Sequence, residues 1–186
     1  MAFNLSLLGA SGGGGGVLAY DLLETTTLSS SASSVTFSGL GAYSDYAHLQ
    51  IRMVARSTAT GSNQNGKVFF NSDLTFYGGN YWTHTLEGSG SSVSPGSGNY
   101  TAPFQLGGAT IVDAWSATVL DILDFSSSSK NTTTRSLNGW ASANVPRIYL
   151  RSTSWNNTDP VTTIKIEDAT GLAVGSRFSL YGIKGA

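Results

Sequence analysis

The amino-acid sequence predicts an all-β protein, an antiparallel β-sandwich of nine or ten strands. Many short segments alternate apolar and polar side chains with a period of two, which is typical of half-buried strands. The segments between them are rich in Gly, Ser, Thr and Asn, and 23 of the 186 residues are glycine. This composition suits short strands joined by polar turns and disfavours helices. A chain of this length commonly forms one sandwich, so we assign residues 17–186 to a single domain and residues 1–16 to an N-terminal arm.

The N-terminal arm combines a short apolar segment with a run of glycines. Residues 11–16 read Ser-Gly-Gly-Gly-Gly-Gly, the most flexible composition available. We expect an extended arm that binds a partner chain through Phe3, Leu5, Leu7 and Leu8, with a disordered leader as the alternative. The arm lacks the positive residues of a signal peptide, so we expect no secretion by that route. It also lacks the Lys-Ser/Thr pair of a phosphate-binding loop.

Strands in the first half of the chain are predicted at 17–28, 35–40, 47–56, 67–71, 81–86 and 104–106. The clearest is 47–56, where apolar and polar side chains alternate and only Val54 departs from the pattern. Such alternation places one face in the core and the other in solvent or in an interface. The predicted core face of this strand consists of Ala47, Leu49, Ile51, Met53 and Ala55. The polar segments 57–66 and 87–100 are predicted to be loops.

The second half of the chain supplies the remaining strands. Segment 115–125 is apolar on both faces, which predicts a central strand or a bulge near Leu120, and segment 132–140 is expected to run back antiparallel to it. In segment 147–152 we expect Ile148 and Leu150 in the core and the alternating Arg and Tyr side chains outside. Segment 161–186 is predicted to be a closing pair of strands. Its core side chains are Ile164, Ile166, Phe178 and Leu180.

The composition excludes several functional classes. Lys plus Arg total 10 and Asp plus Glu total 11, and only 11% of residues are charged, so no nucleic-acid partner is expected. The absence of cysteine excludes disulfides, thiolate catalysis and Cys-ligated zinc. No segment reaches the roughly 18 apolar residues that a membrane span needs, so no membrane partner is expected.

Carboxylates and histidines do not form a catalytic pattern. Asp121 and Asp124 lie three positions apart along one strand. Because this spacing is odd, their side chains point to opposite faces and cannot act on one bond. The two histidines, His48 and His84, show no close spacing to other ligands of the kind a metal site or a catalytic base requires. The sequence therefore predicts a protein that is not an enzyme and that has no metal and no cofactor.

Aromatic residues in polar segments are the candidate contact residues. Tyr77, Tyr81 and Trp82 flank a Gly-Gly-Asn turn, and Trp155 precedes Asn-Asn-Thr. Exposed Tyr and Trp side chains stack on sugars or anchor protein interfaces. We therefore expect these four residues to contact a glycan or a protein, and burial in the core is the alternative.

Several pieces of the chain, in this order, resemble a family of tailed-bacteriophage virion proteins of jelly-roll type. The resemblance spans roughly residues 35 to 184, and its last motif, Phe-x-Leu-Tyr-Gly-Ile, is the most specific. Residues 60–110 show little that matches. The pieces are residues 37–40, 43–46, the strand 48–57, residues 122–130, residues 132–139 and residues 175–184.

The resemblance implies a jelly-roll β-sandwich and a non-enzymatic structural component of a phage virion. A tail-associated subunit (fibre, spike or baseplate) that attaches through its N-terminal arm to other virion proteins is the first expectation. A head-decoration protein and a free carbohydrate-binding module are the alternatives. Family resemblance further implies a homo-oligomer, with a trimer favoured. A host surface glycan is a further expected partner, through segments 57–66 and 87–100.

Overall fold

The computed structural model describes residues 19–61, 63–110, 114–140 and 146–185. In these residues the chain forms two antiparallel β-sheets and one short 3-10 helix, η1 (Leu40–Tyr43), and no α-helix. The expected all-β class is confirmed. The predicted arm, with Phe3, Leu5, Leu7 and Leu8, lies outside the described residues.

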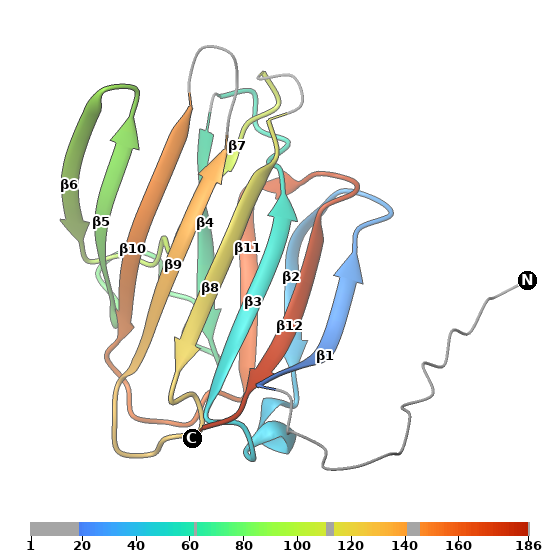
Figure 1. The fold of residues 1–186 in the computed structure, drawn as a ribbon, viewed down its shortest axis with the longest axis vertical. Helices are drawn as coiled ribbons and strands as arrows, with labels where there is room; N and C mark the ends of the chain where they lie inside the picture. The colour runs from blue at the N-terminus through green and yellow to red at the C-terminus, as the bar shows by residue number, and fades with distance from the viewer. Residues whose placement is uncertain (1–18, 62, 111–113, 141–145, 186) are drawn as a thin grey trace, which may run out of the picture.

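The two sheets differ in size (Figure 1). In spatial order, the eight-stranded larger sheet consists of β1 (Tyr20–Thr27), β12 (Arg177–Ile183), β3 (His48–Ala55), β8 (Ser116–Leu123), β9 (Thr132–Trp140), β10 (Arg147–Trp155), β5 (Tyr81–Ser89) and β6 (Ser92–Gly98). The smaller sheet consists of β2 (Ala32–Ser38), β11 (Thr163–Leu172), β4 (Asn63–Phe70) and β7 (Phe104–Gly107).

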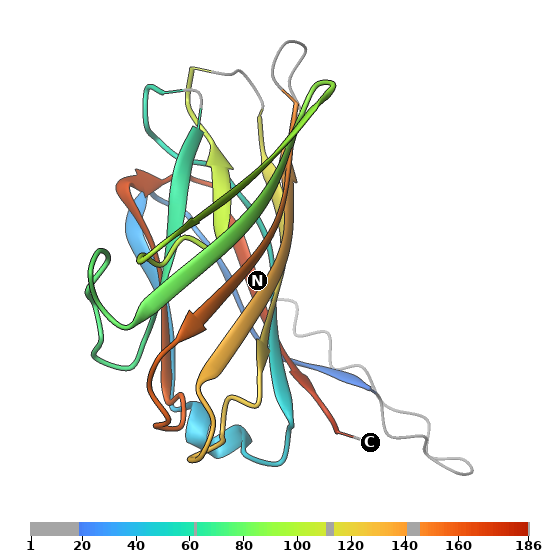
Figure 2. The same cartoon turned by 90° about the vertical axis from the view of Figure 1, so that its left-hand side faces the viewer.

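The apolar core lies between the two sheets, which form two layers in Figure 2. The predicted alternation of β3 is confirmed, because Leu49, Ile51, Met53 and Ala55 are buried while Val54 is exposed on the outer face. Full burial of one such side chain contributes about 1.5–3 kcal/mol to folding. The smaller sheet meets β3 and β12 with side chains of its own, among them Phe37, Val68, Ile164 and Ile166.

The described residues contain twelve strands, so the expectation of nine or ten is wrong. Strand β6 lies inside the predicted loop 87–100, and the first half of β4 lies inside the predicted loop 57–66. Strand β6 has no hydrophobic signal because it is an edge strand with mostly exposed side chains. Backbone pairing with β5 holds it, and the hairpin turns at Gly90, which has a φ of 57° that glycine adopts readily.

The facing of β10 is also opposite to the prediction. Ile148 and Leu150 are exposed, whereas Tyr149 and Arg151 are buried. The register explains the reversal, because Tyr149 and Arg151 lie on the same face as Trp155, whose large ring packs into the core. Side-chain size and contacts between the two sheets therefore decided which face of β10 points to the core. The apolar character of its side chains alone did not.

The inner face of neighbouring β9 is polar as well. Thr134, Ser136 and Asn138 are buried, and each makes hydrogen bonds. Thr134 Oγ1 donates to the carbonyl of Thr153, Ser136 Oγ donates to the carbonyl of Pro103, and Asn138 Nδ2 donates to Thr118 Oγ1. Because buried hydroxyl and amide groups that have partners cost little, this part of the interior is stable without apolar side chains.

The last two strands belong to different sheets. Strand β11 lies between β2 and β4, and β12 lies between β1 and β3. The predicted core side chains of both strands are buried, but the strands are not paired with each other as a closing pair. Strand β8 has the predicted central position, between β3 and β9, without a register shift.

Candidate functional site

The outer face of the larger sheet carries a row of apolar side chains on four adjacent strands. Val119 of β8 lies opposite Leu137 of β9, Leu137 lies opposite Leu150 of β10, and Leu150 lies opposite Leu86 of β5. Each of the four side chains is between 40% and 55% exposed. We call these four residues the apolar row. Side chains that face each other in this way are in contact across the strands.

A second line of residues beside the apolar row extends the hydrophobic surface. Val54, Ile148 and Val93 are its exposed large side chains, and small residues lie between them in register. At Gly88, which pairs with Ile148, an added Cβ would lie 2.7 Å from Ile148 Cγ2. The glycine therefore leaves the space that the Ile148 side chain occupies.

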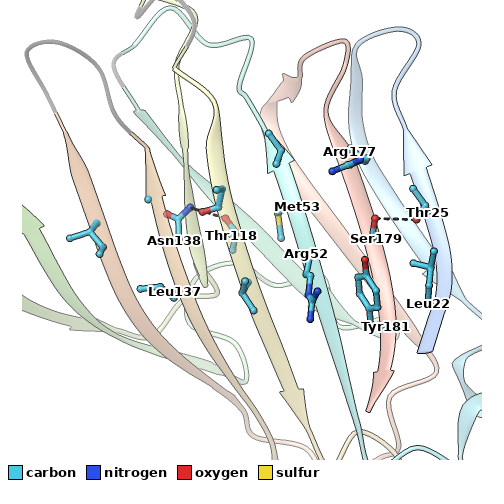
Figure 3. A pocket seen from close by; sticks show the side chains of 15 residues that line it. Leu22, Thr25, Arg52, Met53, Thr118, Leu137, Asn138, Arg177, Ser179 and Tyr181 are labelled. Atoms are coloured by element: carbon cyan, nitrogen blue, oxygen red, sulfur yellow. Dashed lines mark hydrogen bonds between the residues drawn. The ribbon is translucent and has the colours of Figure 1, made fainter. Parts of the chain in front are cut away.

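A hollow of about 760 Å³ lies on this face, with lining residues from six strands of the sheet. Figure 3 shows the side chains that line it, with Leu137 on one side, Leu22 on the other and Arg52 and Tyr181 between them. An exposed antiparallel sheet face usually carries polar side chains. Contiguous apolar surface of this kind marks a site of interaction.

Asp121, which lies beside the apolar row, is paired within the chain. Gln50 Nε2 donates to Asp121 Oδ1 at 2.7 Å, and Arg135 Nη2 donates to Asp121 Oδ2 at 3.1 Å. Arg52 Nε donates to Gln50 Oε1 at 2.7 Å. The Arg52 guanidinium also lies 4.6 Å from the centre of the Tyr181 ring. The Asp121–Arg135 pair can therefore be covered as a pair, whereas Arg52 and Arg177 make no ion pair with a carboxylate among the described residues.

The predicted contact residues divide into two exposed and two buried side chains. Tyr77 is 71% exposed and Trp82 is 49% exposed, and both remain candidates for surface contacts. Trp82 has the same strand parity as Leu86 on β5, so it belongs to the same outer face as the apolar row. Tyr77 packs edge-on against Phe76, with ring centroids 4.2 Å apart.

Tyr81 and Trp155 are buried side chains of the core, so neither is available to a surface ligand. Their rings stack with centroids 6.4 Å apart. The Tyr81 hydroxyl donates to the carbonyl of Asp73 and accepts from the amide of Phe70, and Trp155 Nε1 donates to Asp73 Oδ2 at 2.8 Å. Burial raises the pKa of Tyr81. These contacts make both residues structural.

Two motifs of the resemblance meet at one end of the sandwich. Tyr46, just before β3, packs on Gly182 of β12, where an added Cβ would lie 2.5 Å from Tyr46 Cδ1. The Tyr46 hydroxyl donates to Asp21 Oδ2 at 2.9 Å, and Lys184 Nζ lies 3.4 Å from the same oxygen. A glycine is required at position 182 because the tyrosine ring fills the space of a side chain.

The third motif lies next to them, at the turn after β8. Lys130 Nζ is 2.7 Å from Asp124 Oδ2, and this hydrogen bond lowers the pKa of Asp124. The Asp124 amide donates to His48 Nδ1 at 2.9 Å, which connects the turn to the start of β3. Asp124 and Lys130 line the same hollow, of about 450 Å³, as Tyr46. All three motifs therefore form one cluster.

The sequence did not reveal the apolar row, although it carried one sign of it. Segment 115–125 is apolar on both faces, which we read as central burial, but Val119 is in fact exposed.

Among the described residues, no group of three or more His, Asp or Glu side chains is placed to bind a metal ion. No helix in this part of the chain is long and apolar enough to cross a bilayer.

No protein-family model, no curated protein and no solved structure matches this chain. Its function is therefore inferred from its own residues and their arrangement.

Proposed function

We propose that this protein is a non-enzymatic structural subunit of a tailed-phage virion that assembles with copies of itself through the outer face of the larger sheet. The apolar row is the observation that carries the proposal. Four large side chains in register, each about half exposed, are unfavourable in water and favourable in an interface.

A second copy of this chain is the occupant that best fits the face. Beside the apolar row, Asp121 already accepts hydrogen bonds from Gln50 and Arg135, so an identical face can cover it without burying an unpaired carboxylate. Three copies around a three-fold axis, each with its larger sheet toward the axis, bury the apolar rows of all three. Two copies face to face would also bury their rows, and we favour the trimer because the family resemblance implies it.

The strand order supports a jelly roll. Four strands of the larger sheet follow the order β1-β12-β3-β8, and the smaller sheet follows β2-β11-β4-β7. Along the chain these eight strands alternate between the sheets except at β4 and β7, which follow each other in the smaller sheet, as in a double Greek key. The remaining strands form two insertions, β5–β6 and β9–β10, which both extend the larger sheet on the side of β8. These insertions carry most of the apolar row.

The cluster of the three resemblance motifs supports the assignment to the virion family. Residues 43–46, 122–130 and 175–184 are far apart in the sequence, yet Tyr46, Gly182, Asp124 and Lys130 lie at one end of the fold. Motifs that pack on one another have a common structural role. We place the protein at the phage tail, where residues 1–16 attach it to a neighbouring virion protein.

The test compares the full chain with a variant that lacks residues 2–16. We expect the full chain to be incorporated into phage particles at tens of copies or fewer, as a tail part requires. We expect the shortened chain to keep its β-sheet circular-dichroism spectrum and its oligomeric state but to be lost from the particles. Unchanged incorporation of the shortened chain would contradict attachment through the arm, and hundreds of copies per particle would indicate a head decoration instead.

A further inference from the structure

A small polar cavity lies on the opposite side of the larger sheet from the apolar row. Its volume is about 210 Å³, below the range of about 300–1,000 Å³ for drug-sized ligands. It lies between the inner face of β10, β5 and β6 and the polar side chains of β4 and β7. The residues that line it are Asn65, Thr85, Glu87, Ser94, Pro95, Gly96, Tyr100, Gln105 and Arg151.

Arg151 is the buried charge of this cavity. Its side chain is only 6% exposed, and burial lowers its pKa. Its hydrogen bonds come from Nη1, which donates to the carbonyls of Ala102 at 2.6 Å and Phe104 at 3.1 Å and to Asn65 Oδ1 at 3.4 Å. In the described part of the chain, no carboxylate forms an ion pair with Arg151, and its Nε has no hydrogen-bond partner.

The other charges around the cavity do not neutralise Arg151. Glu87 is the only carboxylate among the lining residues, and its Oε1 accepts from Arg147 Nη1 at 2.5 Å. Arg147 does not line the cavity, but it pairs with Glu87, so the two arginines and one glutamate together leave a formal charge of one positive unit. A buried cation without an anionic partner is unfavourable, so the cavity favours a ligand that carries one negative charge.

The neutral groups of the cavity add a second requirement. Thr85 Oγ1 is buried and has no hydrogen-bond partner among the described residues. Asn65 and Gln105 present amide groups, bonded to each other through Gln105 Nε2 and Asn65 Oδ1 at 3.2 Å. The Tyr100 ring completes the lining. Hydroxyl and amide groups beside an aromatic ring are the groups that bind the hydroxyls and the apolar face of a sugar.

We propose that this cavity binds a single acidic sugar residue, with the sugar carboxylate held by the Nε–Nη2 edge of Arg151 and a sugar hydroxyl bonded to Thr85. Two parallel N–H donors of a guanidinium match the two oxygens of a carboxylate, which makes this pair both strong and directional. The cavity is an internal feature of one chain, so binding does not depend on the assembly proposed above, and either proposal can fail without the other.

Isothermal titration calorimetry with the full chain tests the proposal, with sodium glucuronate as the acidic sugar. Glucose has the same ring without the carboxylate, and acetate has the carboxylate without the ring. We expect glucuronate to bind at least about tenfold more tightly than either control, because each lacks one of the two sets of hydrogen bonds. Absence of glucuronate binding at millimolar concentration, or equal affinity for glucose or acetate, would overturn the proposal.

Two conservative variants make the test specific to the cavity. Thr85→Val removes a hydroxyl that has no partner in the described part of the chain, so we expect unchanged or higher thermal stability and about tenfold weaker glucuronate binding. Tyr149→Phe is the matched control, because it also removes a buried hydroxyl without a partner among the described residues and keeps the ring that lies 4.6 Å from the Arg151 guanidinium, and because Tyr149 is not among the residues that line the cavity. Equal affinities of Thr85→Val and the wild-type chain for glucuronate would refute the proposed pose.

Discussion

Leu137 lies inside the apolar row, between Val119 of β8 and Leu150 of β10. Its side chain is exposed and points away from the core. In the proposed oligomer, Leu137→Asp places a carboxylate in the middle of each apolar contact. We expect this variant to be monomeric and to retain the wild-type fold, because the substituted side chain makes no contact with the interior.

The size of the effect follows from two terms. Burial of the exposed half of a leucine contributes about 1 kcal/mol per copy, and this is lost in the variant. A carboxylate buried in an apolar interface without a partner costs several kcal/mol more. Their sum, at least about 4 kcal/mol, weakens association by about a thousandfold. A dissociation constant of about 1 µM thereby becomes about 1 mM, so the variant is monomeric at tens of micromolar concentration.

Sedimentation velocity over a range of concentrations measures the change. Thr36→Asp is the matched control, because Thr36 is an exposed strand residue on the outer face of the smaller sheet. We expect Thr36→Asp to sediment as the wild-type oligomer does, and circular dichroism should show the same β-sheet spectrum for all three chains. A wild-type chain that stays monomeric at every concentration would refute the reasoning, as would a Leu137→Asp chain that sediments like the wild type.

Three further predictions concern stability. Trp155→Ala should lower the free energy of unfolding by about 3–5 kcal/mol because the ring is buried. Trp82→Ala, at an exposed position, should change it by less than about 0.5 kcal/mol. Urea titration compares the two variants, and equal losses of stability would contradict the assigned burial. Gly182→Ala should cost about 1–3 kcal/mol in the same assay because its Cβ overlaps the Tyr46 ring, and a neutral effect would show that the ring moves freely. Burial opposes ionisation of Glu167, but hydrogen bonds from two lysines outweigh it and lower its pKa, so Glu167→Gln should destabilise the protein at neutral pH by about 0.5–1 kcal/mol. The stability difference between the two chains should vanish as the pH falls below about 4.3 and through the lowered folded-state pKa. A pH-independent difference would exclude the ion pair as its cause.

The sequence correctly predicted which side chains point inward in those strands whose buried face is apolar. In β3, the residues Leu49, Ile51 and Met53 alternate with outward side chains, and the structure has the same facing. The same rule was wrong for β10, where Tyr149 and Arg151 are the inner residues. The rule assumes that the more apolar face of a strand points to the interior of its own chain, and β10 does not satisfy this assumption.

Two other features depend on pairing between distant segments, which periodicity does not report. Strand β6 is an exposed edge strand with Pro95 and glycines, and in the described part of the chain it pairs with β5 alone. The positions of β11 and β12 in two different sheets are set by β2, β4, β1 and β3, which come much earlier in the chain. The buried polar cavity was missed for the same reason, because its lining residues come from β4, β5, β6, β7 and β10 and the segment before β7.

The reversed facing of β10 connects the two surfaces on which the proposals rest. The larger sheet has an apolar inner face at β12 and β3, as an independent sandwich requires. At β9, β10 and β5 the inner face is more polar, with buried Thr and Ser side chains beside Tyr81, Tyr149 and Trp155 and hydrogen bonds such as that between Thr83 and Thr153 at 2.8 Å, and the outer face carries the leucines. A strand with alternating character can place only one of its two faces inward. The inward-facing polar side chains of these strands therefore leave the leucines on the outside, where the proposed contact with a second copy of the chain would bury them.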